Sequence, residues 1–317
     1  MSSTVRLVHT SAGELPAHVA APPSAEIIRH PNAAAAAAKM EMRTLPPALA
    51  ALQSIAATVL PTIVMLAVLL AIWQIACSGE GARLPSPTKI WTDSHDVIMH
   101  PLKGVAIEGF GIKIQDGGDV GIAGHILRSL GRVAIGFGLS ATFGIALGIL
   151  IGQSRTAYRA LDPLFQILRT VPPLAWLPIS LAIFQQAQPS AIFLIFITAI
   201  WPVILNTAAG VQNIPTTYRN VGRVLSLNPF EYFIKIMLPA TVPHMFTGLR
   251  IGVGMSWLAI VAAEMVQGGT GIGFFIWDSY NSSLISDTIV ALIWIGLIGF
   301  ALDRIVGWIG RRIGRQA

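Results

Sequence analysis

The stretch PTTYRNVGRVLSLNPFEYFIKIMLPATVP, residues 215–243, is polar, basic and amphipathic. It separates two apolar runs, 190–210 and 248–266, each close to the length of about 20 residues that a transmembrane helix needs. Its helical periodicity places apolar side chains on one face and charged side chains on another. We therefore expect this stretch to fold outside the lipid, between two membrane-spanning helices.

The composition of the whole chain is that of an integral membrane protein. Of its 317 residues, 54% are hydrophobic and 11% are charged, whereas soluble domains carry about 25% charged residues. The net charge is +6, but much of the Lys and Arg lies at the ends of apolar runs, where it orients helices in the bilayer. No nucleic-acid partner is therefore expected. Cys77 is the only cysteine, which excludes an intramolecular disulfide and a thiolate metal cluster.

The apolar runs predict an all-α integral membrane protein with about six transmembrane helices, embedded in the lipid bilayer. The expected spans are 54–77, 130–152, 163–184, 190–210, 248–266 and 285–309. Residues 54–310 are thus interpreted as the transmembrane domain. Residues 1–50 are rich in Ala, Pro and Ser, and their composition predicts a disordered cytoplasmic tail with one Ala-rich helix at 33–44. The Gly-rich connection 78–125 and the aromatic segment 268–283 are expected to lie outside the lipid.

Positive charges predict that both termini are cytoplasmic. Cytoplasmic loops carry an excess of Lys and Arg close to the ends of spans. This orientation leaves the short turn 185–189 and the segment 268–283 on the outer side, and neither contains Lys or Arg. The basic residues that it places on the inner side are Arg155, Arg159, Arg219, Arg223, Lys235, Arg311, Arg312 and Arg315.

Small residues and prolines mark individual spans. Helical stripes of small residues allow close packing of helices, and two such stripes occur. The two stripes are Gly136, Ser140, Gly144, Gly148, Gly152 on the second span and Gly248, Gly252, Ser256 on the fifth. The stripe on the fifth span is expected at a dimer interface.

The third span contains a predicted helix start and a break. Asp162-Pro163 predicts a capped helix start. Pro172, Pro173 and Pro178 then break the span, as in a helix facing a cavity or in a plain kink.

The stretch 215–243 divides into two helical parts. Residues 218–227 place Tyr218, Val221 and Leu225 on one face. Asn228 then predicts an N-cap, Pro229 suits the first helical position, and Glu231 completes a capping box. Glu231 and Lys235 form a favourable i,i+4 pair. The second part carries an apolar stripe that consists of Phe230, Phe233, Ile234 and Met237. Pro239 and Pro243 are expected to stop the helix before the next span. An amphipathic connector lying on lipid is the alternative.

This stretch resembles the conserved cytoplasmic loop of permease subunits in bacterial ABC importers. That family pattern is Glu-Ala-Ala, three residues, Gly, nine residues, then Ile-x-Leu-Pro. Here residues 220–222 replace the triplet, Ser226 replaces the Gly, and residues 236–239 keep the Ile and the Leu-Pro end. Other segments are similar to the branch of these permeases that imports small oxyanions and organosulfonates: LPSPTKIW (84–91), DPLFQILRTVPPLAWLPI (162–179), FTGLRIG (246–252) and WLAIVAAEM (257–265). Within this branch, TVPPLAWLPI (170–179), residues 213–225 and GIGFFIWDSYNSS (271–283) most resemble the nitrate/nitrite permease group, which is close to the cyanate, bicarbonate and sulfonate/taurine permeases.

The resemblance covers roughly residues 54–310 and implies the fold of a type I ABC importer permease in the bacterial inner membrane. It implies a homodimer, two cytoplasmic ATPase subunits that bind ATP and Mg²⁺, and an external solute-binding protein. The loop 211–243 would be the ATPase-coupling loop, and 229–238 would fill a groove on the ATPase. Its expected residues are Asn220, Val221, Gly222, Ser226, Asn228, Pro229, Phe230, Glu231, Phe233, Ile234, Met237, Leu238 and Pro239.

A translocation path is expected along the third and fifth spans. Charged residues within spans usually face a cavity or a partner. Arg250 would attract a small anion, or else snorkel or pair with Asp162 or Asp303. Glu264 would contact the binding protein, accept backbone amides of 268–273, or make a plain structural hydrogen bond. The path residues expected are Arg169, Pro172, Pro173, Arg250, Trp257 and Glu264.

The sequence lacks the motifs of an enzyme. No Gly-Lys dipeptide occurs, so the chain has no phosphate-binding loop of the GxxxxGK[ST] type. It has neither HExxH nor GxSxG, and no cofactor is expected in this chain. A secondary anion carrier or channel is the alternative of another class, but it predicts repeated broken helices with ionisable pairs at mid-membrane. A membrane anchor without transport is a third class.

Overall fold

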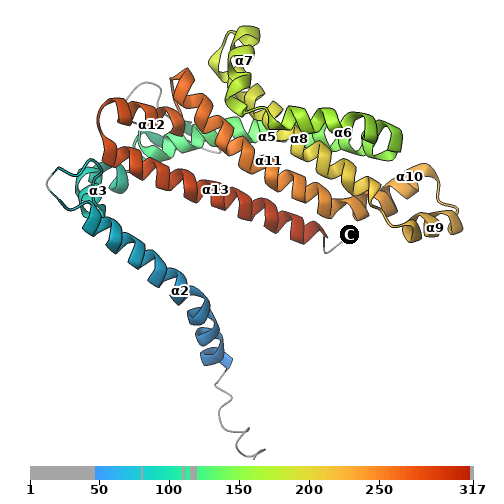
Figure 1. Cartoon of the computed structure of the whole chain (residues 1–317), viewed down its shortest axis with the longest axis horizontal. Coiled ribbons are helices and arrows are strands. Elements are labelled where there is room, and N and C mark those ends of the chain that lie inside the picture. The colour runs from blue at the N-terminus through green and yellow to red at the C-terminus, as the bar shows by residue number, and fades with distance from the viewer. Residues whose placement is uncertain (1–46, 80, 109–110, 115–119, 315–317) are drawn as a thin grey trace, which may run out of the picture. The chain divides into compact units, whose positions relative to one another are not determined.

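A computed structural model of the chain describes residues 47–79, 81–108, 111–114 and 120–314 (Figure 1). The chain forms two units, residues 1–67 and 68–317, which are considered separately. The expected helix at 33–44 lies outside the described residues. Helix α2 (Pro47–Ala76) is apolar on all sides, as in a membrane span. Five helices are long and apolar enough to cross a membrane, or six if one bent pair counts as a span, among the described residues.

Helix α8 (Ala187–Gln212) forms the centre of the second unit, packed against α5 (Ile122–Gln153). The predicted stripe on α5 provides this contact. A Cβ atom added at Gly144 would lie 2.9 Å from the Cβ of Val203, and one at Gly148 would lie 2.6 Å from the Cβ of Thr207. The stripe therefore lets the two backbones approach closely, as small residues do between membrane helices.

The second stripe also faces α8, from helix α11 (Leu238–Gln267). A Cβ atom at Gly248 would lie 2.8 Å from the carbonyl oxygen of Pro202, and one at Gly252 would lie 3.3 Å from that of Ala199. The prediction that this stripe forms a dimer interface is wrong, because α8 of the same chain occupies it. Sequence spacing identified a packing surface but could not identify its partner.

The third expected span is sharply bent. Helix α6 (Arg155–Thr170) and the pair η1 (Pro173–Trp176) and α7 (Leu177–Phe184) meet at 95°. Val171 and Pro172 are extended, because a residue before proline disfavours the helical region. The predicted helix start at Asp162-Pro163 is wrong. Ser154 caps α6 earlier by accepting from the amide of Ala157, and Pro163 lies inside the helix.

The end of the bundle near α12 (Ile272–Asn281) holds the largest apolar core. Ile122 and Ile126 of α5, Ile260 of α11 and Ile272 of α12 are buried together there, and α13 (Ile285–Gly314) packs on α11 and α12. The aromatic segment 268–283, for which no secondary structure was predicted, contains the helix α12. We call this the α12 end, and the opposite end, near α9, the α9 end (Figure 1).

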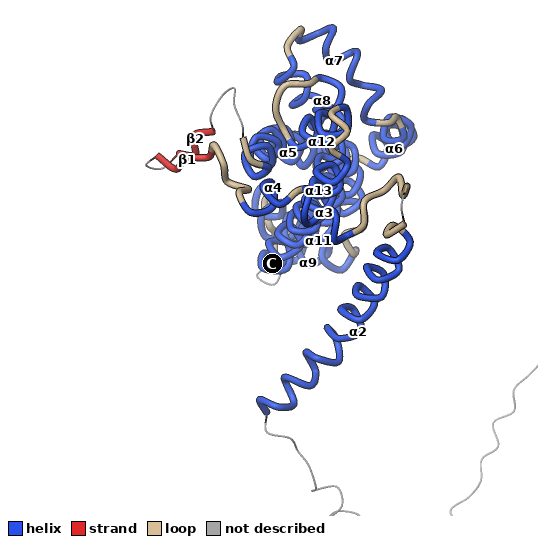
Figure 2. The backbone as a smooth tube through the Cα atoms, turned by 90° about the vertical axis from the view of Figure 1, so that its left-hand side faces the viewer, coloured by secondary structure: helices blue, strands red, loops and turns tan. Residues whose placement is uncertain are grey.

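The connection 78–125 contains secondary structure of its own. It includes α3 (Pro87–Asp93), α4 (His95–Met99) and the strands β1 (Val105–Glu108) and β2 (Gly111–Ile114). The strands pair antiparallel with Val105 opposite Ile114 and project as a small hairpin (Figure 2). The remainder of the described chain is helices and short connections, as predicted for an all-α membrane protein.

The helix that follows the stretch 215–228 does not stop at its prolines. Helix α10 (Pro229–Tyr232), the π-helical turn η2 (Phe233–Met237) and α11 form one uninterrupted helical segment of 39 residues. The prediction that Pro239 and Pro243 end a helix is wrong. Pro239 lies in the first turn of α11 directly after η2, and such π-turns absorb irregularities within helices.

Candidate functional site

Helices α9 (Thr216–Val224) and α10 form a helical hairpin at the α9 end of the bundle (Figure 1). The predicted capping box of α10 is present. The Glu231 amide donates to Asn228 Oδ1 at 2.8 Å, and the Asn228 amide donates to Glu231 Oε2 at 3.2 Å. Lys235 Nζ lies 3.0 Å from Glu231 Oε1. These short-range bonds, with Pro229 at the first helical position, fix the start of the long helix.

The turn between α9 and α10 depends on two small residues. Gly222 is buried, and a Cβ atom there would lie 2.8 Å from the ring of Tyr232. Gly222 therefore allows α9 to pack against α10. Ser226 has a φ of +49°, a left-handed conformation that glycine adopts more readily than other residues. This is the position at which the resembling loops carry glycine, so the backbone explains that preference.

The predicted apolar stripe of the second part divides into two sides. Met237 is buried and Phe233 half-buried, and both pack with Val211 of α8 and Ile214 of the connection that follows α8. The rest of the stripe is exposed. Several apolar residues of α9 are exposed as well, so both parts of the hairpin present an apolar surface. We call the exposed set the hairpin apolar surface: Tyr218, Val221, Val224, Leu225, Phe230 and Ile234.

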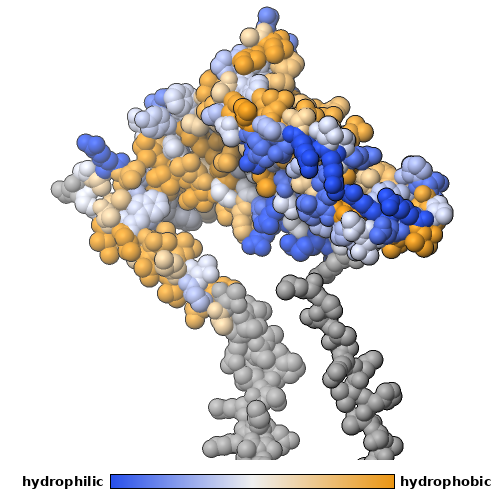
Figure 3. All heavy atoms as spheres, turned by 45° about the vertical axis from the view of Figure 1, so that its right-hand side comes forward, coloured by the Kyte–Doolittle hydropathy of each residue, from blue (hydrophilic) through white to orange (hydrophobic). Residues whose placement is uncertain are grey.

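Basic residues lie beside this surface. A groove of about 500 Å³ between α9 and α10 is lined by Arg219 and Arg223 together with Gly222, Ser226 and Tyr232. Figure 3 shows the surrounding surface, where hydrophilic residues gather on one part of a largely hydrophobic molecule. Asn220 is exposed, and Leu238 and Pro239 are half-buried where the hairpin joins α11. The hairpin thus combines exposed apolar side chains with positive charge, a combination suited to a protein surface with acidic groups.

The path residues of the third span lie at its bend. Arg169 is in the last turn of α6 and is exposed, and Pro172 and Pro173 form the break between α6 and η1. They are exposed or half-buried. Among the described residues, no hydrogen bond or ion pair joins Arg169 to Arg250 or Glu264. Their part in a path remains a prediction.

Arg250 and Trp257 both bind helix α13. Arg250 forms an ion pair with Asp303 through two hydrogen bonds, of which the Nη2–Oδ2 bond is 2.6 Å long. Trp257 is buried, and its Nε1 donates to the carbonyl oxygen of Ile295 at 3.0 Å. The pair with Asp303 was one of the expected alternatives for Arg250. These contacts tie α11 to α13 at two levels.

Glu264 lies at the α12 end and is buried. Its carboxylate accepts from Arg132 Nη1 at 2.6 Å, from Ser129 Oγ at 2.8 Å and from the Gly273 amide at 3.1 Å. The amide contact was one of the expected alternatives, whereas Arg132 and Ser129 were missed. A signal existed, because Arg132 is a lone charge near the start of an apolar run, and such a charge usually has a partner.

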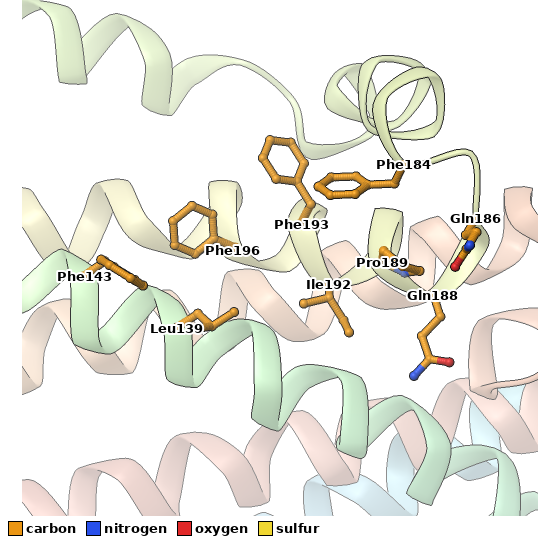
Figure 4. A pocket seen from close by; sticks show the side chains of 9 residues that line it. All are labelled: Leu139, Phe143, Phe184, Gln186, Gln188, Pro189, Ile192, Phe193 and Phe196. Carbon is orange, nitrogen blue, oxygen red and sulfur yellow. The ribbon is translucent and has the colours of Figure 1, made fainter.

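An open pocket of about 500 Å³ lies between α5, α7 and α8 (Figure 4). Phe143 of α5, Phe184 of α7, and Phe193 and Phe196 of α8 dominate its lining. Its polar side chains are the amides of Gln186 and Gln188, and no charged residue lines it. Its chemistry suits lipid chains or another apolar surface, and it lacks the charge that would hold an anion.

The described residues contain no group of three or more His, Cys, Asp or Glu side chains that could hold a metal ion. Ordinary metal centres draw several ligands from these residue types.

Known proteins similar to this chain are components of membrane transport systems. Residues 144–315 match the family described as binding-protein-dependent transport system inner membrane component. The chain is 57% identical over 247 residues to the nitrate import permease protein NrtB of Synechocystis sp., covering 78% of this chain and 86% of that protein. It is 49% identical over 251 residues to the bicarbonate transport system permease protein CmpB of Synechococcus elongatus, covering 78% and 86%. A solved chain of the MetNI methionine ABC transporter in an inward-facing conformation has a similar fold, with a TM-score of 0.52, 16% identity, and coverage of 61% of this chain and 95% of that chain.

Proposed function

Because this chain belongs to the family of binding-protein-dependent transport system inner membrane components, we propose that it carries nitrate or nitrite across the membrane. It is a permease subunit of an ABC importer, an inner membrane component with the type I permease fold, and not an enzyme. The observation that carries the proposed substrate is the 57% identity to NrtB of Synechocystis sp. over most of both chains. NrtB and CmpB of Synechococcus elongatus are each 49% identical to this chain.

Importers of this family combine the permease with ATPase subunits and a substrate-binding protein. We assign the specific assembly as a homodimer of this chain with two cytoplasmic ATPase subunits at the α9 ends. The α12 ends would face the binding protein on the outer side, and both termini would be cytoplasmic. The exposed basic residues of the hairpin support this orientation, because Lys and Arg favour the cytoplasmic side. ATP and Mg²⁺ would be bound by the ATPase subunits.

The hairpin apolar surface is the proposed ATPase contact. Phe230 is 69% exposed and Ile234 is 45% exposed, and they lie four residues apart on one helical face. An amphipathic helix that lays such residues into an apolar groove is a common recognition mode. Met237, three residues after Ile234, is buried against Val211 and Ile214 and anchors the helix to the bundle. The hairpin would therefore be gripped on one side and held rigidly on the other.

Movement would pass from the hairpin into the membrane through the long helix. The segment 229–267 has 39 residues, which corresponds to a length of about 58 Å at helix rise. The capping box fixes its start, and Arg250 and Trp257 join it to α13. Closure of the ATPase subunits would thus displace α11 and α13 together and switch access from one side of the membrane to the other.

Cross-linking tests the docking assignment. In a Cys77→Ser background, Phe230→Cys and Ile234→Cys should form cross-links to an ATPase subunit carrying a cysteine at its groove. Met237→Cys is the matched control, because Met237 lies on the same helix but is buried. Labelling of Phe230→Cys and Ile234→Cys by lipid-soluble reagents alone, without cross-links, would contradict ATPase docking.

Reconstituted transport tests the substrate. The permease, its ATPase subunits and its binding protein would be placed in proteoliposomes, and uptake of nitrate, nitrite and bicarbonate measured with and without ATP. ATP-dependent uptake of nitrate or nitrite is expected. Bicarbonate is the second candidate because of the similarity to CmpB, and uptake of bicarbonate alone would overturn the nitrate proposal. Cyanate and taurine serve as further substrates of the same test. Uptake by this chain without ATP or partners would indicate a secondary carrier.

A further inference from the structure

A buried ionic cluster joins three segments at the α12 end. Arg132 and Ser129 come from α5, Glu264 from α11, and Thr270 from the connection to α12. Arg132 Nη1 lies 2.6 Å from both Glu264 Oε1 and the carbonyl oxygen of Thr270. Its side chain is 19% exposed and that of Glu264 is 2% exposed. The cluster is therefore largely withdrawn from solvent and connects residues more than 130 positions apart.

The start of α12 is held by the same cluster. The Ile272 amide donates to Ser129 Oγ at 3.0 Å, and the Gly273 amide donates to Glu264 Oε2 at 3.1 Å. The Gly271 amide donates to His125 Nδ1 at 3.3 Å. Successive amides at this helix start are thus satisfied by side chains of α5 and α11, which also orients a carboxylate toward the positive end of α12. The position of α12 depends directly on these side chains.

The glycines of the connection let the backbone close over the carboxylate. Gly268, Gly269 and Gly271 have φ angles of +74°, +93° and +134°, which glycine adopts at little cost. A Cβ atom at Gly271 would overlap the Glu264 carboxylate, and one at Gly273 would lie 2.9 Å from Glu264 Cβ. Gly271 and Gly273 therefore allow the backbone to approach Glu264 closely.

Stability alone does not account for an ionic cluster at this buried position. A buried ion pair can often be replaced by apolar residues without loss of stability, whereas removal of one partner leaves an uncompensated charge. The core around it is apolar, with Ile122, Ile126 and Ile272 buried nearby. The directional ionic and hydrogen-bonded contacts instead hold the connection 268–271 and the start of α12 in one position relative to α5 and α11.

We propose that Glu264, with Arg132 and Ser129, is a positioning residue for transport. The cluster fixes α12 and the connection 268–271 to the far end of the helical segment 229–267. Displacement received at the hairpin is thereby passed to α12, whose Trp277 and Tyr280 are exposed. Without the cluster α11 still moves, but α12 no longer follows. The inference rests on the proposed function, since it assumes that ATPase subunits drive the α9 end.

The test separates coupling from folding. Glu264→Gln, Arg132→Gln and Ser129→Ala would be compared with wild type in the full complex, in proteoliposomes. The matched control is Arg128→Gln, because Arg128 is the same residue type one turn away on α5, where its Nη2 donates to the Ile114 carbonyl oxygen. At equal amounts of assembled complex, we expect nitrate uptake to fall at least about tenfold in the first two variants while ATP hydrolysis continues. Arg132→Lys should recover part of the uptake. Uptake and hydrolysis that fall in the same proportion as assembled complex, or that both stay at wild-type levels, would overturn the proposal.

Hydrogen exchange provides a readout that does not depend on the substrate. Amides 271–273 should be protected in wild type, and their protection should change when ATP closes the ATPase subunits. In Ser129→Ala, which leaves the ion pair in place, that ATP-linked change should be reduced. If wild type responds to ATP but imports no nitrate, the substrate proposal fails and the positioning role stands. If Ser129→Ala and Glu264→Gln respond as wild type does, the positioning role fails.

Discussion

Two glutamates on one helical segment illustrate different ways of holding a helix end. Glu231 at the α9 end is bonded to Asn228 and Lys235, its neighbours in sequence, and lies at the surface. Glu264 at the α12 end is buried, and its partners Ser129 and Arg132 are more than 130 residues away. The bonds of Glu231 fix the start of α10, which lies at the surface. The bonds of Glu264 fix how α5, α11 and α12 pack together, so loss of Glu264 should lower stability much more than loss of Glu231.

The largest effect is expected for Glu264→Gln. The change leaves the Arg132 guanidinium without its counter-ion in a buried site, and loss of one partner of a buried pair typically costs about 3–5 kcal/mol. The expected result is a clearly lower thermal midpoint of the detergent-solubilised protein, followed by tryptophan fluorescence. Glu231→Gln is the control, and it should leave the midpoint nearly unchanged because Glu231 is solvated. Equal shifts in the two variants would contradict the comparison.

A methyl group at Gly273 should also destabilise the α12 end. Its Cβ would run into the carbonyl oxygen of Val261 and lie 2.9 Å from Glu264 Cβ, and overpacking of this kind costs about 1–3 kcal/mol. Gly254→Ala is the matched control, because Gly254 lies on α11 with open space around its Cβ position. Thermal unfolding of both variants should show a lower midpoint for Gly273→Ala alone. A midpoint for Gly273→Ala as high as that of the control would mean that the connection can shift away from Glu264.

The two ends also differ in what the sequence revealed. The capping box was predictable because Asn228, Pro229 and Glu231 are close in the chain and obey local rules. The small-residue stripes were predictable as packing surfaces, but not the choice of α8 as their common partner. Arg132 was missed because its acceptor is 132 residues away and no local rule relates them. The prediction that the helix ends at Pro239 and Pro243 failed because it relied on a local rule alone. A π-helical turn and tertiary packing keep the helix continuous there despite the prolines.

A smaller effect, of opposite sign, is expected at the α9 end from Ser226→Gly. Ser226 has a φ of +49°, and a left-handed residue other than glycine costs about 1–2 kcal/mol. Glycine removes that strain but loses more conformational entropy on folding, about 0.5–1 kcal/mol. The variant should therefore be more stable by up to about 1.5 kcal/mol. Ser226→Ala, which keeps the strain and removes the hydroxyl, is the control in the same thermal measurement. A Ser226→Gly variant no more stable than Ser226→Ala would contradict the strain, and a loss of stability in Ser226→Ala relative to wild type would show that the hydroxyl has a role.

The smallest effect on stability is expected between the two ends, at Arg250. Arg250 and Asp303 are both more exposed than the buried pair Arg132–Glu264, so loss of one partner leaves a less enclosed charge. Arg250→Ala should therefore assemble normally, with a smaller shift in thermal midpoint than Glu264→Gln.

The effect of Arg250→Ala on nitrate uptake decides between two roles for the positive charge. If the guanidinium serves α13 through Asp303, the isosteric Asp303→Asn should change nitrate uptake as Arg250→Ala does. If the guanidinium attracts the anion, Arg250→Ala should slow uptake while Asp303→Asn, which leaves the positive charge uncompensated, should raise it. Unchanged uptake in Arg250→Ala would remove Arg250 from the path.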